Sequence, residues 1–359
     1  MINHTGCCNV QEKIQDTSRI LKKMITMNPK DTVLLTRSNV AQLLSIEECI
    51  VAVEQAFKLY GSGAAQAPGV LGIHAKDGGF HIKAGILNLS KNYFVAKINA
   101  NFPGNNIKFG LPTIQGAIAV FDAEIGRLLA LMDSIEITII RTGAATAVAA
   151  KWLAKEKAKI VTVCGSGNQG KISLRAVMKV RQLEKIFVFD IDEKKAQQFA
   201  NDLSEELEIS FQPVNELKKA VMQSDICITC TPSKKYFLLR EYISPGTFIA
   251  AVGADSEDKQ ELEPSLLISG KLVTDITAQS ATIGELHHAI KLELATVDTI
   301  HAELGQIITG QKAGRESDKE IIIFDSTGTA LQDVAAAAIV YEKALINKIG
   351  TSMNFSDAT

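Results

Sequence analysis

The stretch from Lys159 to Asp190 restricts the fold more than any other part of the chain. A run of β-branched and apolar residues, 160–164, leads into three glycines with the spacing G-x-G-x-x-G, which are Gly165, Gly167 and Gly170. Apolar residues at helical spacing come next, and a second apolar run, 186–189, ends at Asp190. The pattern predicts a strand, a tight turn, a helix and a second strand.

This arrangement is typical of a dinucleotide-binding site. The first glycine permits the turn, the second lets a pyrophosphate approach the backbone, and the third lets the helix pack against the strand. Unpaired N–H groups and a partial positive charge at the helix N-terminus favour phosphates, so Asn168 and Gln169 are candidate cofactor contacts. A glycine turn without a ligand is the alternative, but the flanking strands, the helix and the acidic residue favour a cofactor.

Asp190 indicates which dinucleotide binds. A carboxylate at this place accepts hydrogen bonds from both hydroxyls of the adenosine ribose and repels the additional phosphate of NADP. We therefore expect NAD rather than NADP, although Lys194 and Lys195 just downstream weaken that preference.

Composition argues against several classes of partner. At 359 residues the chain is long enough for two domains. A net charge of −2, without a basic run interleaved with aromatic residues, does not favour nucleic acid or an anionic membrane surface. Small molecules are therefore the expected partners. No apolar run reaches the length of about 20 residues that spans a bilayer.

Residues 1–30 are expected to form an N-terminal extension, because they show neither the apolar core nor the cleavage site of a secretory signal. Six cysteines in a chain of this length indicate reduced thiols and a cytoplasmic setting. Cys227 and Cys230 have the spacing of a redox or zinc motif, but they lie in a strand-like run without a second cysteine pair. No metal site is expected there or at the histidines, His287, His288 and His301.

The region before residue 122 has the pattern of an α+β fold. A strand at 32–35 precedes a helix at 46–60, and short β-like pieces over 70–121 indicate an antiparallel sheet. Lys83 and Lys97 interrupt apolar strands of this region. Because an unpaired buried ammonium is costly, each should face solvent or an anion, and a solvated face is favoured for either lysine alone.

Arg141 is expected at the head of a helix rich in small residues, which can approach its neighbours closely. An anion-facing guanidinium and an ordinary interdomain ion pair are both compatible with that place.

From residue 194 to residue 274, strand and helix patterns alternate, which predicts a doubly wound parallel sheet. Ligands bind beyond the carboxyl ends of such strands, where Thr231, Pro232 and Asp255 fall. An aspartate after Gly-Ala is also a common turn former. A strand at 321–324 and an Ala-rich helix at 330–346 follow, and the small residues indicate that this helix returns to pack against the first domain.

Several segments, taken together, resemble the ornithine cyclodeaminase and mu-crystallin family. They occur in family order and cover most of the chain: VAKINANFPGN (95–105), GLPTIQG (110–116), RTGAATAVAAKWLA (141–154), VCGSGNQG (163–170), AVGADSEDKQEL (251–262) and FDSTGTALQDVAAA (324–337). The resemblance implies a Rossmann domain for NAD, residues 143–324, inserted in an α+β domain for substrate binding and dimerisation, residues 31–142 and 325–359. It also implies a homodimer.

The resemblance assigns roles to particular residues. Lys97 and Arg141 match positions that bind the substrate carboxylate, and Asp255 matches the catalytic acid and base. Thr113 matches a position that lines the cofactor and substrate sites, and Thr327 matches one near the nicotinamide. Cyclodeaminases place a further arginine before the GGFHIKAG strand, whereas this chain has Gly69 and Val70 there, and Lys83 is the candidate replacement.

Three functions are compatible with these residues. The first is an ornithine cyclodeaminase-like enzyme that converts L-ornithine, or a related L-amino acid, to L-proline and ammonia by hydride abstraction to NAD and return. The second is an NAD(P)-dependent oxidoreductase, such as an alanine dehydrogenase, a ketimine or pyrroline-2-carboxylate reductase, or an N-alkyl amino acid synthase. The third is a mu-crystallin-like binding protein, against which the retention of Lys97, Arg141 and Asp255 argues. The first is the favoured hypothesis.

Overall fold

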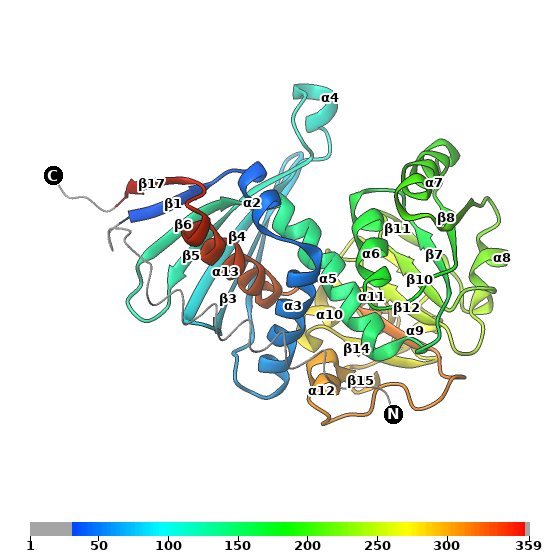
Figure 1. Ribbon diagram of the computed structural model, residues 1–359. Helices are drawn as coiled ribbons and strands as arrows, with labels where there is room; N and C mark the ends of the chain where they lie inside the picture. The colour runs from blue at the N-terminus through cyan, green and yellow to red at the C-terminus, as the bar shows by residue number, and fades with distance from the viewer. Residues whose placement is uncertain (1–30, 356–359) are drawn as a thin grey trace, which may run out of the picture.

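Two large β-sheets organise the chain, one mixed and one parallel (Figure 1). The computed structural model describes residues 31–355, so the expected extension over 1–30 lies outside the described residues. Strand β11 (Lys234–Leu238) and strand β13 (Gln260–Leu262) form a further, two-stranded sheet.

The mixed sheet has seven strands in the order β17-β1-β6-β5-β4-β3-β2. Strands β2 to β6 pair antiparallel, as expected, whereas β1 runs parallel to β6. The strands are β1 (Asp31–Leu35), β2 (Gly69–Ala75), β3 (Gly78–Asn88), β4 (Asn92–Asn101), β5 (Ile114–Asp122), β6 (Leu128–Asp133) and β17 (Thr351–Asn354).

Helices cover one face of this sheet (Figure 1). Helix α3 begins with a capping box in which Ser45 and Glu48 each accept a backbone N–H of the other. The Ala-rich helix α13 packs against α3, β3 and β4, so its expected return to the first sheet is confirmed. The bounds are α2 (Arg37–Leu43), α3 (Ile46–Gly61) and α13 (Ala330–Asn347), while the short α4 (Asn105–Phe109) projects from the sheet.

The expectation of a solvated face for Lys83 and Lys97 was wrong. Both side chains are buried, because they lie on the face of β3 and β4 that α13 covers. Each ammonium therefore has to find partners inside the protein.

The second sheet has eight parallel strands in the order β15-β14-β16-β12-β10-β7-β8-β9. The expected doubly wound sheet is confirmed, and its strand order reverses between β7 and β10. The strands are β7 (Ile160–Cys164), β8 (Lys185–Phe189), β9 (Ser210–Pro213), β10 (Ile226–Thr229), β12 (Phe248–Ala251), β14 (Lys271–Thr274), β15 (Ile300–Glu303) and β16 (Ile322–Asp325).

Short helices connect these strands. They are α6 (Asn168–Met178), α7 (Glu193–Leu207), α8 (Leu217–Val221), α9 (Pro264–Leu267), α10 (Thr277–Ile283), α11 (Glu285–Lys291) and α12 (Leu304–Ile308), with 3₁₀ turns at Arg240–Tyr242 and Val297–Thr299. Within residues 31–355, we find no helix that combines the length and the hydrophobicity needed to cross a bilayer.

Helix α5 (Ile135–Leu153) connects the two sheets and packs against α3, α6 and α13. It begins at Ile135, so the expectation that Arg141 stands at the head of a helix was wrong, and Arg141 lies well inside α5. The β-branched run before Arg141 concealed the first turns of the helix from a reading of periodicity. The proposed domain ranges stay a prediction.

Candidate active site

The glycine motif forms a tight turn between β7 and α6. Gly165 has a φ of 106°, and a Cβ there would lie 2.9 Å from Cys230 O. A Cβ on Gly170 would lie 2.2 Å from Gly165 O, whereas one on Gly167 would point into open space. The first and third glycines are therefore required by the protein itself, and the second leaves the backbone accessible to a ligand.

The turn lies where the order of the parallel strands reverses, beside the end of β10. Thr231 packs next to Gly165, and the buried atoms Ser166 Oγ and Gln169 Oε1 have no hydrogen-bond partner within the described part of the chain. Unsatisfied polar atoms beside open backbone N–H groups fit a dinucleotide diphosphate. Pro232 follows Thr231 in the same loop.

Asp190 lies at the end of β8, adjacent to the turn. Its Oδ2 accepts the N–H of Ser166 at 2.8 Å, and its Oδ1 accepts the N–H of Asp192 at 3.0 Å. Asp190 therefore holds the glycine turn in place and keeps lone pairs for ribose hydroxyls. The Nζ of Lys195, a residue that weakens the preference for NAD, lies 3.8 Å from Asp192 Oδ2, and this carboxylate offsets the positive charge of the lysine.

A buried charge cluster joins three elements of the mixed-sheet region. Lys97 of β4 lies 2.8 Å from both carboxylate oxygens of Asp333 of α13. Arg141 of α5 places its Nε 3.1 Å from Asp333 Oδ1 and donates from Nη1 to Gln332 Oε1 at 2.8 Å. Two cations thus share one carboxylate, which leaves positive charge for a substrate anion.

Lys83 enters the same region from β3. Its Nζ donates to the carbonyls of Thr327 at 2.9 Å and Gly328 at 2.6 Å. The register places Lys83 directly opposite both Lys97 and Val70, on one face of the sheet. Lys83 therefore stands beside Val70, and its role as a replacement for the further arginine stays a prediction.

Burial and the charges inside the cluster together shift the pKa of its members. Burial lowers the pKa of Lys97 to about 7, with Arg141 and Lys83 adding to the decrease and Asp333 opposing it. Burial also lowers the pKa of Lys83, and neighbouring Arg141 contributes. Burial raises the pKa of Asp333, but Lys97 and Arg141 outweigh it, so the net pKa is lowered and the carboxylate is ionised.

The loop after β16 is held by a buried acid, Asp275. Its Oδ1 accepts the hydroxyl of Thr327 at 2.9 Å, and its Oδ2 accepts the N–H of Gly328 at 2.7 Å. Gln279 adds a bond from Nε2 to Gly328 O at 3.0 Å. Thr327 is thus a fixed part of the wall beside Lys83 and Arg141.

Asp255 follows β12 and pairs with Lys259 at 2.6 Å. Its side chain is 56% exposed, so a ligand can reach it. Partial desolvation raises the pKa of Asp255, but Lys259, Lys83 and His81 together lower it more, and the net pKa is lowered. The carboxylate of Asp255 is therefore ionised, and its hydrogen-bond partner is the ammonium of Lys259.

Thr113 is the predicted site residue that lies apart from the cluster. It immediately precedes β5, where its carbonyl accepts the N–H of Phe102 at 2.9 Å. Lys97 pairs with Ile118, five residues further along the strand. At about 3.3 Å per residue, roughly 16 Å of strand separate Thr113 from that position.

Sequence reasoning missed several residues of this site. Asp333 and Gln332 are buried polar residues on the otherwise Ala-rich helix α13. Polar residues in such an apolar segment are the feature of the sequence that could have marked them as site residues. Asp275 directly follows a buried parallel strand, a place where ligand-site side chains are common.

Comparison with known proteins identifies relatives that match most of the chain. The model of the ornithine cyclodeaminase/mu-crystallin family matches residues 30–348. Alanine dehydrogenase of Archaeoglobus fulgidus is 37% identical over 326 residues, which cover 90% of this chain and 99% of that protein.

Two solved structures share the architecture. An archaeal alanine dehydrogenase dimer with bound NAD has a TM-score of 0.87 at 37% identity, covering 90% of this chain and 99% of that one. The Δ1-pyrroline-2-carboxylate reductase of Thermococcus litoralis, solved with NADH and L-proline, has a TM-score of 0.84 at 35% identity, covering 90% and 100%.

Proposed function

Because the chain belongs to the ornithine cyclodeaminase/mu-crystallin family, we propose that it is an NAD-dependent oxidoreductase that interconverts an L-amino acid and the corresponding imino acid. One observation carries the proposal at this site. Three basic side chains, Lys83, Lys97 and Arg141, are buried in one region. Asp333 pairs with Lys97 and Arg141 and can neutralise only one of the positive charges, so a substrate carboxylate would balance part of the remainder.

The cofactor is proposed to be NAD, with NADP less favoured. When bound, its nicotinamide supplies or takes up the hydride at the substrate carbon. The backbone of the glycine turn would hold the diphosphate, and Asp190 would accept the ribose hydroxyls. The residues assigned to this site are Gly165, Gly167, Asn168, Gln169, Gly170, Asp190, Thr231 and Pro232, with Thr327 toward the nicotinamide. Thr113 is not assigned to it, because it lies apart from the Lys97 cluster.

The chain's own residues would orient the substrate and handle its protons. Lys97 and Arg141 bind the carboxylate, and Lys83 contributes a third positive charge beside it. In the oxidative direction Asp255 accepts a proton from the substrate ammonium, a role that its lowered pKa suits because the carboxylate is ionised. In the reductive direction the protonated carboxyl of Asp255 would return that proton to the amine nitrogen once the imino carbon has been reduced.

The relatives favour this reaction over the cyclodeaminase reaction that the sequence placed first. Their names describe a dehydrogenase and a reductase of amino and imino acids. Val70 in place of the further arginine also separates this chain from the cyclodeaminase pattern. Cyclisation of L-ornithine with no net change of cofactor remains the competing outcome in the test.

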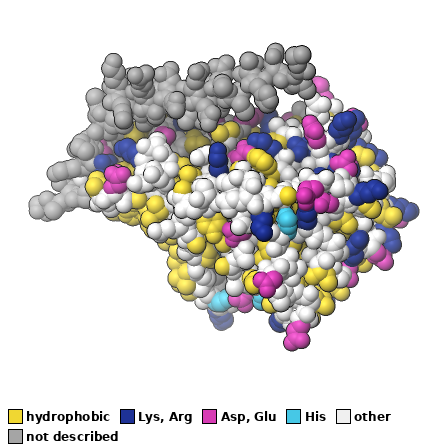
Figure 2. All heavy atoms as spheres, turned by 90° about the horizontal axis from the view of Figure 1, so that it is seen from below, with side chains coloured by type: hydrophobic (Ala, Val, Ile, Leu, Met, Phe, Trp, Pro, Cys, Tyr) yellow, Lys and Arg dark blue, Asp and Glu magenta, His cyan; other side chains and the backbone are white. Residues whose placement is uncertain are grey.

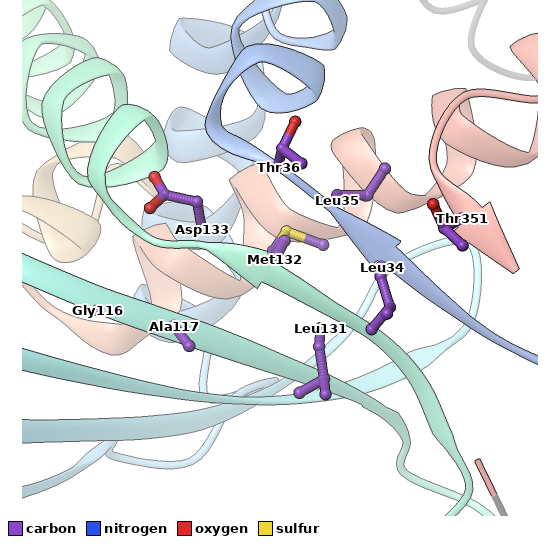
Figure 3. Close-up of a pocket in the computed structure, with 9 residues that line it drawn as sticks. All are labelled: Leu34, Leu35, Thr36, Gly116, Ala117, Leu131, Met132, Asp133 and Thr351. Atoms are coloured by element: carbon purple, nitrogen blue, oxygen red, sulfur yellow. The ribbon is translucent and has the colours of Figure 1, made fainter. Parts of the chain in front are cut away.

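A second copy of the chain is the proposed macromolecular partner. The face of the mixed sheet away from α13 exposes the apolar side chains of Leu71, Ile73, Phe80, Ile86 and Ile98. A shallow depression of about 390 Å³ lies on this face between β1, β5 and β6. Figure 3 labels its lining residues, among them the half-buried Leu34 and Leu131. Elsewhere, acidic and basic side chains are interspersed on the face seen in Figure 2. An apolar sheet face of this kind fits a homodimer.

The decisive assay is a panel of L-amino acids and cyclic or acyclic imino acids with NAD, NADH and their phosphorylated forms, with products identified by mass. We expect stoichiometric change of the cofactor with one group of substrates. Asp255→Asn should lower kcat at least about 100-fold. The control Asp258→Asn removes an exposed acid of the same loop, which pairs with Lys234 at 3.1 Å, and should leave kcat unchanged.

A further inference from the structure

A buried glutamate, Glu261, joins the loops that follow two neighbouring strands of the parallel sheet. Its Oε1 accepts the N–H of Thr231 at 2.5 Å after β10, and its Oε2 accepts the N–H of Gly253 at 3.1 Å after β12. The side chain is fully buried. One carboxylate therefore sets the separation of the loop proposed to hold the cofactor and the loop that carries Asp255.

Gly253 rests directly on this carboxylate. A Cβ at position 253 would lie 2.4 Å from Glu261 Cδ and from its Oε2, closer than non-bonded atoms approach. The contact leaves no room for any side chain at Gly253, so the loop backbone is held against Glu261 by shape as well as by a hydrogen bond.

Two further buried acids hold Glu261 itself. Glu285 accepts the N–H groups of Glu261 at 2.8 Å and Leu262 at 3.0 Å. Asp325 in turn accepts the N–H of Glu285 at 3.1 Å and of Leu286 at 3.0 Å. Burial raises the pKa of all three acids. This succession of carboxylates starts beside the Thr327 loop and ends at Thr231 and Gly253.

We propose that Glu261 is a positioning residue that couples the cofactor loop after β10 to the Asp255 loop after β12. The inference rests on the proposed function of those loops, because Glu261 acts through their backbone. Binding of the cofactor at Thr231 is transmitted through Glu261 to Gly253, and so to the carboxylate two residues further on.

Glu261→Gln tests the coupling with little change of shape. The amide keeps one acceptor oxygen and turns an NH₂ group toward the other backbone N–H, so one of the two loops is released. Glu263→Gln is the matched control, because Glu263 Oε2 also accepts a backbone N–H, that of Arg240 at 2.8 Å, but touches neither loop. Hydrogen exchange by mass spectrometry, the Kd of NADH and kcat are measured on the full chain.

In the wild type, NADH should slow exchange in residues 230–233 and also in residues 253–259. In Glu261→Gln the protection of 253–259 should disappear, the Kd of NADH should rise, and kcat should fall about tenfold, whereas Glu263→Gln should match the wild type. Retained protection of 253–259 in a folded Glu261→Gln protein would overturn the proposal. If Glu261→Gln does not fold, Gly253→Ala disrupts the same contact. In that variant too, NADH should no longer slow hydrogen exchange in residues 253–259.

Hydrogen exchange also distinguishes a failure of the coupling through Glu261 from a failure of the proposed reaction. If no substrate of the panel is turned over but NADH still protects both loops through Glu261, the reaction has been assigned wrongly and the coupling stands. If turnover occurs and protection of 253–259 does not depend on Glu261, the reaction stands and the coupling is refuted.

Discussion

Gly328 lies against the guanidinium of Arg141, and a Cβ added at position 328 would be 2.5 Å from Arg141 Nη1. Gly328 also has a φ of 74°, in the left-handed region. Both constraints require glycine. The orientation of the arginine that we assign to the substrate carboxylate therefore depends on a residue without a side chain.

Gly328→Ala should displace the guanidinium and raise KM for the carboxylate substrate by about tenfold or more, with the Kd of NADH within about twofold of the wild type. Gly310→Ala is the control, because Gly310 has the same φ of 74° and open space at its Cβ. Steady-state kinetics and a cofactor titration measure both. An equal rise of KM in the two variants would assign the effect to backbone strain.

Asp333→Asn should destabilise the protein by about 3–5 kcal/mol, because it leaves Lys97 and Arg141 buried without their shared carboxylate. Urea unfolding measures the change. Asp77→Asn, which breaks an exposed pair with Lys108 at 3.3 Å, should cost less than about 1 kcal/mol. Similar losses in both variants would mean that the buried cluster contributes no more than a surface pair.

The Lys97 ammonium should make substrate capture depend on pH. Burial lowers its pKa to about 7, so the charge is present below that pH and is lost as pH rises above it. We expect kcat/KM to fall as pH rises through about 7 and, in Lys97→Met, to be lower at pH 6 and to lack this fall. If kcat/KM of Lys97→Met still fell as pH rises through about 7, the titration would belong to another group.

Asp325 should make stability depend on pH in the opposite sense to Asp333, whose pKa is lowered by the cations beside it. Burial raises its pKa from 3.8 to about 7, so between these values the folded protein binds a proton that the unfolded chain has released. The free energy of unfolding therefore falls as pH rises from about 4 to about 7.

Asp325→Asn should make that decrease less steep, while the exposed Asp318→Asn should leave the slope unchanged. Denaturant unfolding at several pH values gives both slopes. An unaltered slope in Asp325→Asn would show that the other buried acids, Glu261, Glu285 and Asp275, account for the whole decrease.

Local signals predicted the parallel sheet well. The glycine turn, the capping box of α3 and the alternation of strands and helices depend on residues close together in the chain, so periodicity and spacing were sufficient. The start of α5 was missed because β-branched residues precede Arg141 in its first turns.

The buried partners of the lysines were beyond such reasoning. Lys97 is paired with Asp333, a residue 236 positions away, and Lys83 with the carbonyls of Thr327 and Gly328. Only the return of α13 across the sheet turns an apparently solvated strand face into a closed charge cluster. The succession of Asp325, Glu285 and Glu261 was invisible for the same reason, because each acid binds backbone N–H groups of a distant segment.

The most direct test of the proposed function follows a labelled hydride. The protein is incubated with NADH that carries deuterium at both positions of the nicotinamide C4 and with Δ1-pyrroline-2-carboxylate, or with pyruvate and ammonia, and the amino acid product is examined by mass. Our account predicts one deuterium at Cα for each NADH consumed, with NAD accumulating in equal amount. Conversion of L-ornithine to proline and ammonia with no net change of cofactor, and no reduction of either imino acid, would contradict it.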